Sequence, residues 1–118
     1  IAAIIDGTAD IGMSSRELKG KEKASAGANG VRLTKTVVAL DAVAVIVNEN
    51  NPISKLSLKD IERIFTDDVT DWSSVGGKSG KISAYTRNTS SGTYAFFQKF
   101  ALASRDYGNS TQKMAGNE

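Results

Sequence analysis

The longest apolar stretch of the chain covers residues 34–48. Its valines and isoleucine favour a β-strand, and its apolar positions are continuous rather than alternating, which is typical of a strand buried on both faces. A shorter apolar run at residues 11–13 predicts another buried strand, and residues 81–86 predict a further one. Asp41 interrupts the longest run with a carboxylate.

Helical patterns lie between these runs. Residues 1–9 predict the end of a helix, with Ile1, Ile4 and Ile5 on one face and Gly7 as its stop. Residues 17–30 predict a helical turn followed by a loop. Further on, Ser57 has the position of an N-cap and Asp60 follows at capping-box spacing. One face of the helix that they begin carries these apolar residues: Leu58, Ile61, Ile64 and Phe65.

Residues 91–103 predict a second, well-buried helix. Its apolar stripe consists of Tyr94, Phe97 and Ala101, with Phe96 and Phe100 beside it. Trp72 is predicted in a loop, and its ring, like the phenylalanines, is expected in the core. Strands that alternate with helices predict an α/β fold with a mostly parallel sheet.

Composition narrows the chemistry. The chain has 118 residues, enough for one small domain, and no apolar run of the roughly 20 residues that a membrane helix needs. Its 15 basic and 13 acidic residues leave a net charge of +2, which gives no reason to expect nucleic acid as a partner. Cysteine and histidine are both absent, so thiol catalysis, zinc–thiolate sites and a Ser/His triad are excluded. The functional groups left to the chain are hydroxyls, carboxylates, basic groups and backbone amides. As a set, they suit the binding of an anion better than the breaking of a bond.

One hydroxyl-rich turn has the right character for an anion site. Residues 85–94 join a predicted strand to a predicted helix, whose first amides have no internal partner and lie at the positive end of the helix dipole. Ser91 and Thr93 add hydroxyl donors, Gly92 permits close approach of the backbone, and Arg87 can bind two oxygens at once. Ordinary N-capping of the helix is the alternative interpretation.

Two other features fit the same picture. Ser15 and Arg16 form a second hydroxyl and arginine turn after a predicted strand, where ligands lie in open α/β sheets. A helix cap followed by a solvated arginine is the alternative interpretation. Asp41 is costly to bury without partners. It either faces water at a bend or accepts hydrogen bonds from Arg16, Arg87 or a protonated ligand.

The motifs DGTADIGMSSREL, ALDAVAVIVNENNPISKLSLKDIERIFTDDVTDWSSVGG and RNTSSGTYAFFQKF resemble the phosphate-binding proteins of high-affinity phosphate ABC transporters. The resemblance covers most of residues 1–103 in the correct order. It implies a two-lobed type II periplasmic-binding-protein fold, with mixed, mostly parallel sheets flanked by helices and phosphate held between the lobes. It implies neither a cofactor nor a metal ion.

Carried over by position, the resemblance assigns phosphate contacts to Arg87, Ser91, Gly92 and Thr93. Ser15 stands where better-known members have an aspartate that accepts the proton of the phosphate. In this Ser-Ser-Arg branch, Asp41 would take over as the acceptor and Arg16 would balance its charge.

The resemblance also implies a longer protein. Residues 1–40 would belong to the first lobe, and residues 41–118 would form the crossover strand and much of the second lobe. A strand with a hydroxyl-bearing loop and a second Gly/Ser turn are expected before Ile1, and segments that complete both lobes are expected after Glu118. The implied partners are inorganic phosphate, a membrane permease and the remainder of the chain itself. The implied location is the periplasm or the outer face of the cytoplasmic membrane, with a lipid anchor.

Other functions remain open at this point. Another oxyanion such as sulfate, molybdate or tungstate is the nearest alternative ligand. A phosphoester hydrolase would use similar donors, but the missing histidine and the lack of clustered carboxylates for metals favour a protein that is not an enzyme. An adhesion or sensor module on the same fold is a third possibility, against which the intact turn at residues 87–93 counts.

Overall fold

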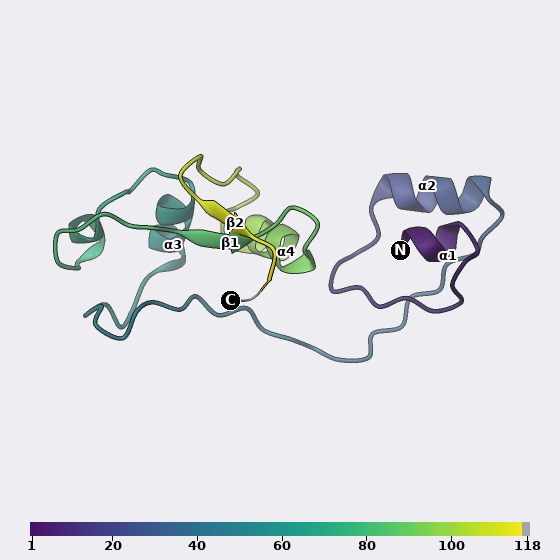
Figure 1. Ribbon diagram of the computed structural model, residues 1–118, viewed down its shortest axis with the longest axis horizontal. Helices are drawn as coiled ribbons and strands as arrows, with labels where there is room; N and C mark the ends of the chain where they lie inside the picture. The colour runs from purple at the N-terminus through teal and green to yellow at the C-terminus, as the bar shows by residue number, and fades with distance from the viewer. Residues whose placement is uncertain (117–118) are drawn as a thin grey trace. The chain divides into compact units, whose positions relative to one another are not determined.

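The computed structural model describes residues 1–116 and contains two compact units, Ile1–Ala42 and Val43–Glu118 (Figure 1). The predicted division between residues 40 and 41 lies close to this boundary. Its assignment of the two parts to lobes stays a prediction.

The first unit contains two helices, α1 (Ala2–Ile5) and α2 (Gly20–Ala28), which lie side by side in Figure 1. The predicted helix at the start of the chain is confirmed, and Gly7 follows it with a φ of 70°, a left-handed conformation that glycine adopts without strain. Asn29 at the end of α2 donates a hydrogen bond of 3.0 Å from its side chain to the carbonyl of Ile5. This bond fixes the end of one helix against the other.

The two strands predicted at residues 11–13 and 34–48 are wrong for this chain. Neither segment belongs to a strand of the described residues, and the apolar side chains are largely exposed: Ile11 by 88%, Leu40 by 95% and Ile46 by 88%. A strand exists only where a neighbour pairs with its N–H and C=O groups, and β-propensity does not supply that neighbour.

The second unit begins with an extended segment and then forms α3 (Leu58–Phe65). The predicted capping box is confirmed: the Ser57 hydroxyl accepts a 3.0 Å hydrogen bond from the Asp60 amide, and the Asp60 carboxylate accepts one from the Ser57 amide. Ile64 is buried as predicted, whereas Leu58 in the first turn is 68% exposed.

The core of this unit lies beside α3. It consists of Ile64, Val69, Ile82 and Ala84, with Leu56, Phe65, Trp72 and Val75 packed against it. The predicted core position of Trp72 is confirmed, but the predicted loop is a short 3-10 helix, η1 (Trp72–Val75). Asp71 caps η1 by accepting a 2.9 Å hydrogen bond from the Ser73 amide. A local side-chain cap therefore turns this loop into a helical turn.

The sheet consists of two parallel strands, β1 (Tyr85–Arg87) and β2 (Gln112–Met114), in which Tyr85 pairs with Gln112 and Arg87 with Met114. The predicted strand at residues 81–86 is thus shorter and lies further along the chain. Helix α4 (Gly92–Phe100) connects to β1 through a tight turn (Figure 1).

The aromatic residues of α4 divide between two environments. Phe97 packs edge-on against Phe65 with a centroid distance of 4.9 Å, as expected for a core residue. Phe96 and Phe100 are 47% and 60% exposed, so their predicted core positions are wrong. They lie four residues apart on another face of the helix and contact each other at 4.6 Å.

Candidate functional site

The predicted strand, turn and helix around residues 85–94 are present. β1 ends at Arg87, and α4 begins at Gly92 with Ser91 as its N-cap. The Ser91 hydroxyl accepts a 3.2 Å hydrogen bond from the Thr93 amide, so the capping interpretation is realised. Because a hydroxyl oxygen that accepts a bond keeps its own proton, Ser91 can still donate to a ligand.

Hydrogen bonds hold the turn at both ends. The Asn88 amide donates to the Met114 carbonyl at 2.9 Å, which continues the pairing of β1 with β2. The Asn88 carbonyl accepts from the Ser91 amide at 3.0 Å, and its side-chain oxygen accepts from the Ser90 hydroxyl at 2.7 Å. Sequence reasoning missed Asn88, although asparagine in a turn is a known signal of such local bonds.

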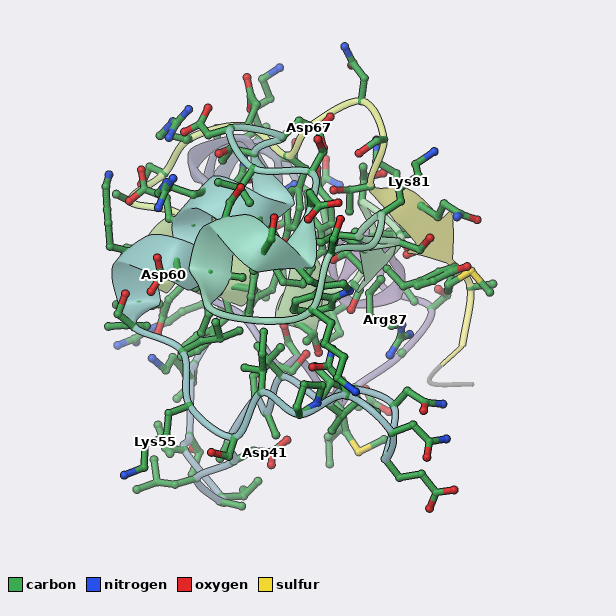
Figure 2. The ribbon with its side chains drawn as sticks, turned by 90° about the vertical axis from the view of Figure 1, so that its left-hand side faces the viewer. Asp41, Lys55, Asp60, Asp67, Lys81 and Arg87 are labelled. Carbon is green, nitrogen blue, oxygen red and sulfur yellow. The ribbon has the colours of Figure 1, made fainter. Side chains whose placement is uncertain are left out.

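Arg87 stands at the carboxyl end of β1, next to this turn (Figure 2). The residue is partly buried, and its guanidinium donates a 3.2 Å hydrogen bond to the carbonyl of Ala115. The turn thus has a guanidinium at its strand end, and the first amides of α4 and the hydroxyls of Ser91 and Thr93 at its helix end. All of these groups favour a negatively charged oxygen.

A groove of about 780 Å³ adjoins the turn within the second unit. Arg87 and Thr93 belong to its lining, but most of its walls are apolar and come from residues 43–47 and from core residues such as Ile64 and Ile82. An anion in such a groove would lose hydration without compensation. The turn, rather than the groove, has the character of an anion site.

In the first unit, Arg16 forms an ion pair with a carboxylate. Its guanidinium donates two hydrogen bonds to Glu22, of 2.9 Å and 2.7 Å, and both side chains are only 22% exposed. The preceding Ser15 is exposed, and it is the Ser14 hydroxyl that donates to the Arg16 carbonyl at 2.9 Å. The predicted pairing of Arg16 with a ligand or with Asp41 would have to compete with Glu22.

This ion pair predicts a pH dependence of the first unit. The hydrogen bond from Arg16 is the main reason why the pKa of Glu22 falls from 4.5 to about 2. Because the folded pKa is the lower one, the stabilisation is fully present above about pH 4.5 and is lost as the pH falls towards 2. A carboxyl-detected NMR titration should find this low midpoint, and Arg16→Gln should return it towards 4.5. An unchanged midpoint in Arg16→Gln would contradict the pairing.

Asp41 lies near the end of the first unit and is exposed. Its carboxylate accepts a 2.7 Å hydrogen bond from the amide of Ala42. This geometry matches the alternative in which the carboxylate faces water at a bend. Within residues 1–116, its other oxygen accepts no hydrogen bond and so keeps its full accepting capacity.

None of the helices in residues 1–116 has the length and the apolar composition that a membrane-spanning helix requires. The same residues contain no cluster of three or more acidic side chains that could hold a metal ion.

A family model described as a PBP superfamily domain matches residues 1–118. The chain belongs to this superfamily. Phosphate-binding protein PstS 2 of Streptococcus agalactiae is 47% identical over 73 residues, which cover 62% of this chain and 23% of the relative. Phosphate-binding protein PstS of Pseudomonas aeruginosa is 32% identical over an alignment that covers 98% of this chain and 40% of the relative. The chain therefore spans between about a quarter and two fifths of these curated relatives.

Two solved structures contain a part whose fold is similar to that of this chain. A phosphate ABC transporter substrate-binding protein of Clostridium perfringens, solved with bound phosphate, matches 85% of this chain and 39% of its own with a TM-score of 0.74 and 37% identity. A phosphate transport receptor of Vibrio cholerae matches 98% of this chain and 47% of its own, with a TM-score of 0.69 and 27% identity. The predicted family and the predicted α/β fold, part of a type II periplasmic-binding-protein fold, are confirmed.

Proposed function

We propose that the full-length protein binds inorganic phosphate and delivers it to the permease of an ABC transporter. The observation that carries this proposal is the turn at the start of α4, where Arg87, Ser91, Gly92 and Thr93 present a guanidinium, amides and hydroxyls together. The names of the relatives and the phosphate in the Clostridium perfringens protein support the choice of ligand.

The same turn favours binding over catalysis. Its donors can hold the oxygens of a tetrahedral anion, but a hydrolase would also need a group that activates water. The sequence has no histidine for that purpose. Since binding proteins of ABC transporters act outside the cytoplasm, we place the full-length protein there, in contact with a membrane permease. An adhesion or sensor module would not need this set of donors.

The ligands most similar to phosphate in shape and charge are other oxyanions. Sulfate, molybdate and tungstate are tetrahedral, and the donors of the turn would fit their oxygens as well. Phosphate differs because it keeps a proton near neutral pH, and a carboxylate that accepts this proton would reject fully ionised sulfate. Asp41 is the residue that we propose for this role, while Ser15 and Arg16 stay predicted contacts from the resemblance.

Isothermal calorimetry on the full-length protein tests the ligand directly. Phosphate, sulfate and molybdate are titrated separately at neutral pH, after the protein has been unfolded and refolded to remove any bound anion. Phosphate should bind in the micromolar range or tighter, which is about −8 kcal/mol or more favourable, and sulfate should be much weaker. Preferred binding of molybdate or sulfate would overturn phosphate as the ligand.

The selectivity should depend on Asp41. Asp41→Asn replaces an acceptor by a group that can also donate, so sulfate should become a better competitor of phosphate. Competition binding at neutral pH measures the ratio of the two affinities. Asp10→Asn, another exposed carboxylate of the first unit, is the control that should leave the ratio unchanged. If Asp41→Asn also leaves it unchanged, Asp41 is not the acceptor.

A further inference from the structure

Residues 105–111 form a segment that is fixed to the end of α3. The Arg105 guanidinium donates to both oxygens of Asp68, at 2.6 Å and 2.9 Å. The Gly108 amide donates to the Phe65 carbonyl at 2.8 Å. Because polar bonds hold the segment on both sides of residue 107, the side chain at that position has a well-defined place.

That side chain is Tyr107, and it contacts both β1 and α4, the two elements that flank the turn at residues 88–91, here called the anion turn. Its hydroxyl donates a 3.1 Å hydrogen bond to the carbonyl of Tyr94, in the first turn of α4, and its ring stacks on the Tyr94 ring with a centroid distance of 4.4 Å. The side chain of Thr86, in β1, also acts on the Tyr107 hydroxyl and lowers its pKa. One phenol therefore joins the strand before the turn to the helix after it.

The Tyr107 side chain is held in place, and its hydroxyl remains a hydrogen-bond donor. Burial raises the pKa of Tyr107 and outweighs the opposite effect of Thr86, so the hydroxyl keeps its proton at neutral pH and continues to donate. Phe65 and Phe97 surround the ring at centroid distances of 6.4 Å and 6.3 Å. These contacts restrict the ring to one orientation.

We propose that Tyr107 is a positioning residue for the anion site. By joining Thr86 to Tyr94, it sets the spacing between β1 and α4, and with it the geometry of Arg87 relative to the amides and hydroxyls of residues 91–93. Binding groups must be held to within about 0.5 Å to act together on one ligand. The inference rests on the proposed binding of phosphate, and Tyr107 itself need not touch the anion.

The test compares Tyr107→Phe with wild type in the full-length protein. This substitution keeps the stacked ring and removes only the hydroxyl. Phosphate binding by calorimetry should weaken about fivefold, the size of one lost hydrogen bond. Tyr85→Phe is the matched control, because Tyr85 lies in β1 with 53% of its surface exposed, and it should bind phosphate as wild type does.

A second measurement, by NMR, distinguishes a residue that positions the turn from one that only stabilises the fold. Amide resonances of Ser91, Gly92 and Thr93 are recorded without ligand, well below the melting temperature of each variant. A positioning role shifts these resonances in Tyr107→Phe and not in Tyr85→Phe, whereas a purely structural role lowers only the melting temperature. If Tyr107→Phe does not fold, Thr86→Val removes the other partner of the phenol and takes its place in both measurements, with Thr86→Ser as the control that keeps the hydroxyl.

The outcomes for ligand and residue are distinguishable. If wild type binds phosphate and Tyr107→Phe binds it equally well with unshifted amides, the inference on Tyr107 is overturned and the proposed function stands. If wild type binds no phosphate, the proposed function is overturned. In that case the resonances of residues 91–93 still decide whether Tyr107 positions the turn.

Discussion

Replacing Arg87 by alanine in the full-length protein is expected to weaken phosphate binding by at least about tenfold, since the loss of a desolvated, hydrogen-bonded charge costs roughly 2–5 kcal/mol. Arg87 is half-buried at the end of β1, beside the first amides of α4. Its guanidinium is the only full positive charge in residues 85–94, so the amides and hydroxyls of the turn cannot replace it. Calorimetry with phosphate measures the change.

A second arginine of the same unit provides the control. Arg63 lies on α3, where its guanidinium contacts the Asp60 carboxylate at 3.4 Å, and Arg63→Ala should leave the affinity for phosphate unchanged. Arg87→Lys keeps the charge but loses the two-pronged donor, so an intermediate affinity is expected. A change of less than about twofold in Arg87→Ala would remove Arg87 from the binding site, because it lies below the effect of a single hydrogen bond.

The local parts of the site could be predicted from the sequence because their physics is local. The capping box of Ser57 and Asp60 and the N-cap at Ser91 each depend on residues within three positions of one another. The turn between β1 and α4 follows from the same short-range preferences. The turn therefore has Arg87 at the end of β1 and Ser91, Gly92 and Thr93 at the start of α4, and their joint role in binding stays a prediction.

The strands could not be predicted in the same way. Residues 34–48 have the composition of a buried strand, yet a strand also needs a partner, and that partner is a property of the whole fold. β1 shows the reverse: it forms where β2, more than twenty residues later, supplies the pairing, and so it covers residues 85–87 rather than 81–86. Propensity indicated the segment, and pairing determined its ends.

The hydrogen-bond partners of Arg16 and Tyr107 could not be predicted from the sequence either. Arg16 was expected to serve Asp41 or a ligand, but Glu22, in the first turn of α2, binds it with both oxygens. Tyr107 was assigned no role, because its contacts with Thr86 and Tyr94 depend on how a segment returns to the sheet. Glu22 lies six residues from Arg16, and Tyr94 lies thirteen residues from Tyr107, so no short or periodic spacing indicates either pair.

Replacing Leu102 by alanine should produce the largest loss of stability in the second unit. Leu102 follows α4 and is 0% exposed, and its amide donates a 3.2 Å hydrogen bond to the carbonyl of Phe97. Removing a fully buried leucine side chain lowers the free energy of unfolding by about 2–5 kcal/mol, through the lost transfer of apolar surface and the cavity that remains. Denaturant unfolding of the full-length protein, followed by the fluorescence of Trp72 in the same unit, measures this loss.

The control is Leu58→Ala, because Leu58 is the same residue type with 68% of its surface exposed. It should change the free energy of unfolding by no more than about 0.5 kcal/mol, as is usual for surface positions. Alanine also fits the first turn of α3, so the helix itself is not weakened. Equal losses in the two variants would contradict the burial of Leu102. A large loss in Leu102→Ala alone would confirm that the side chain two residues after the end of α4 is enclosed by the rest of the unit.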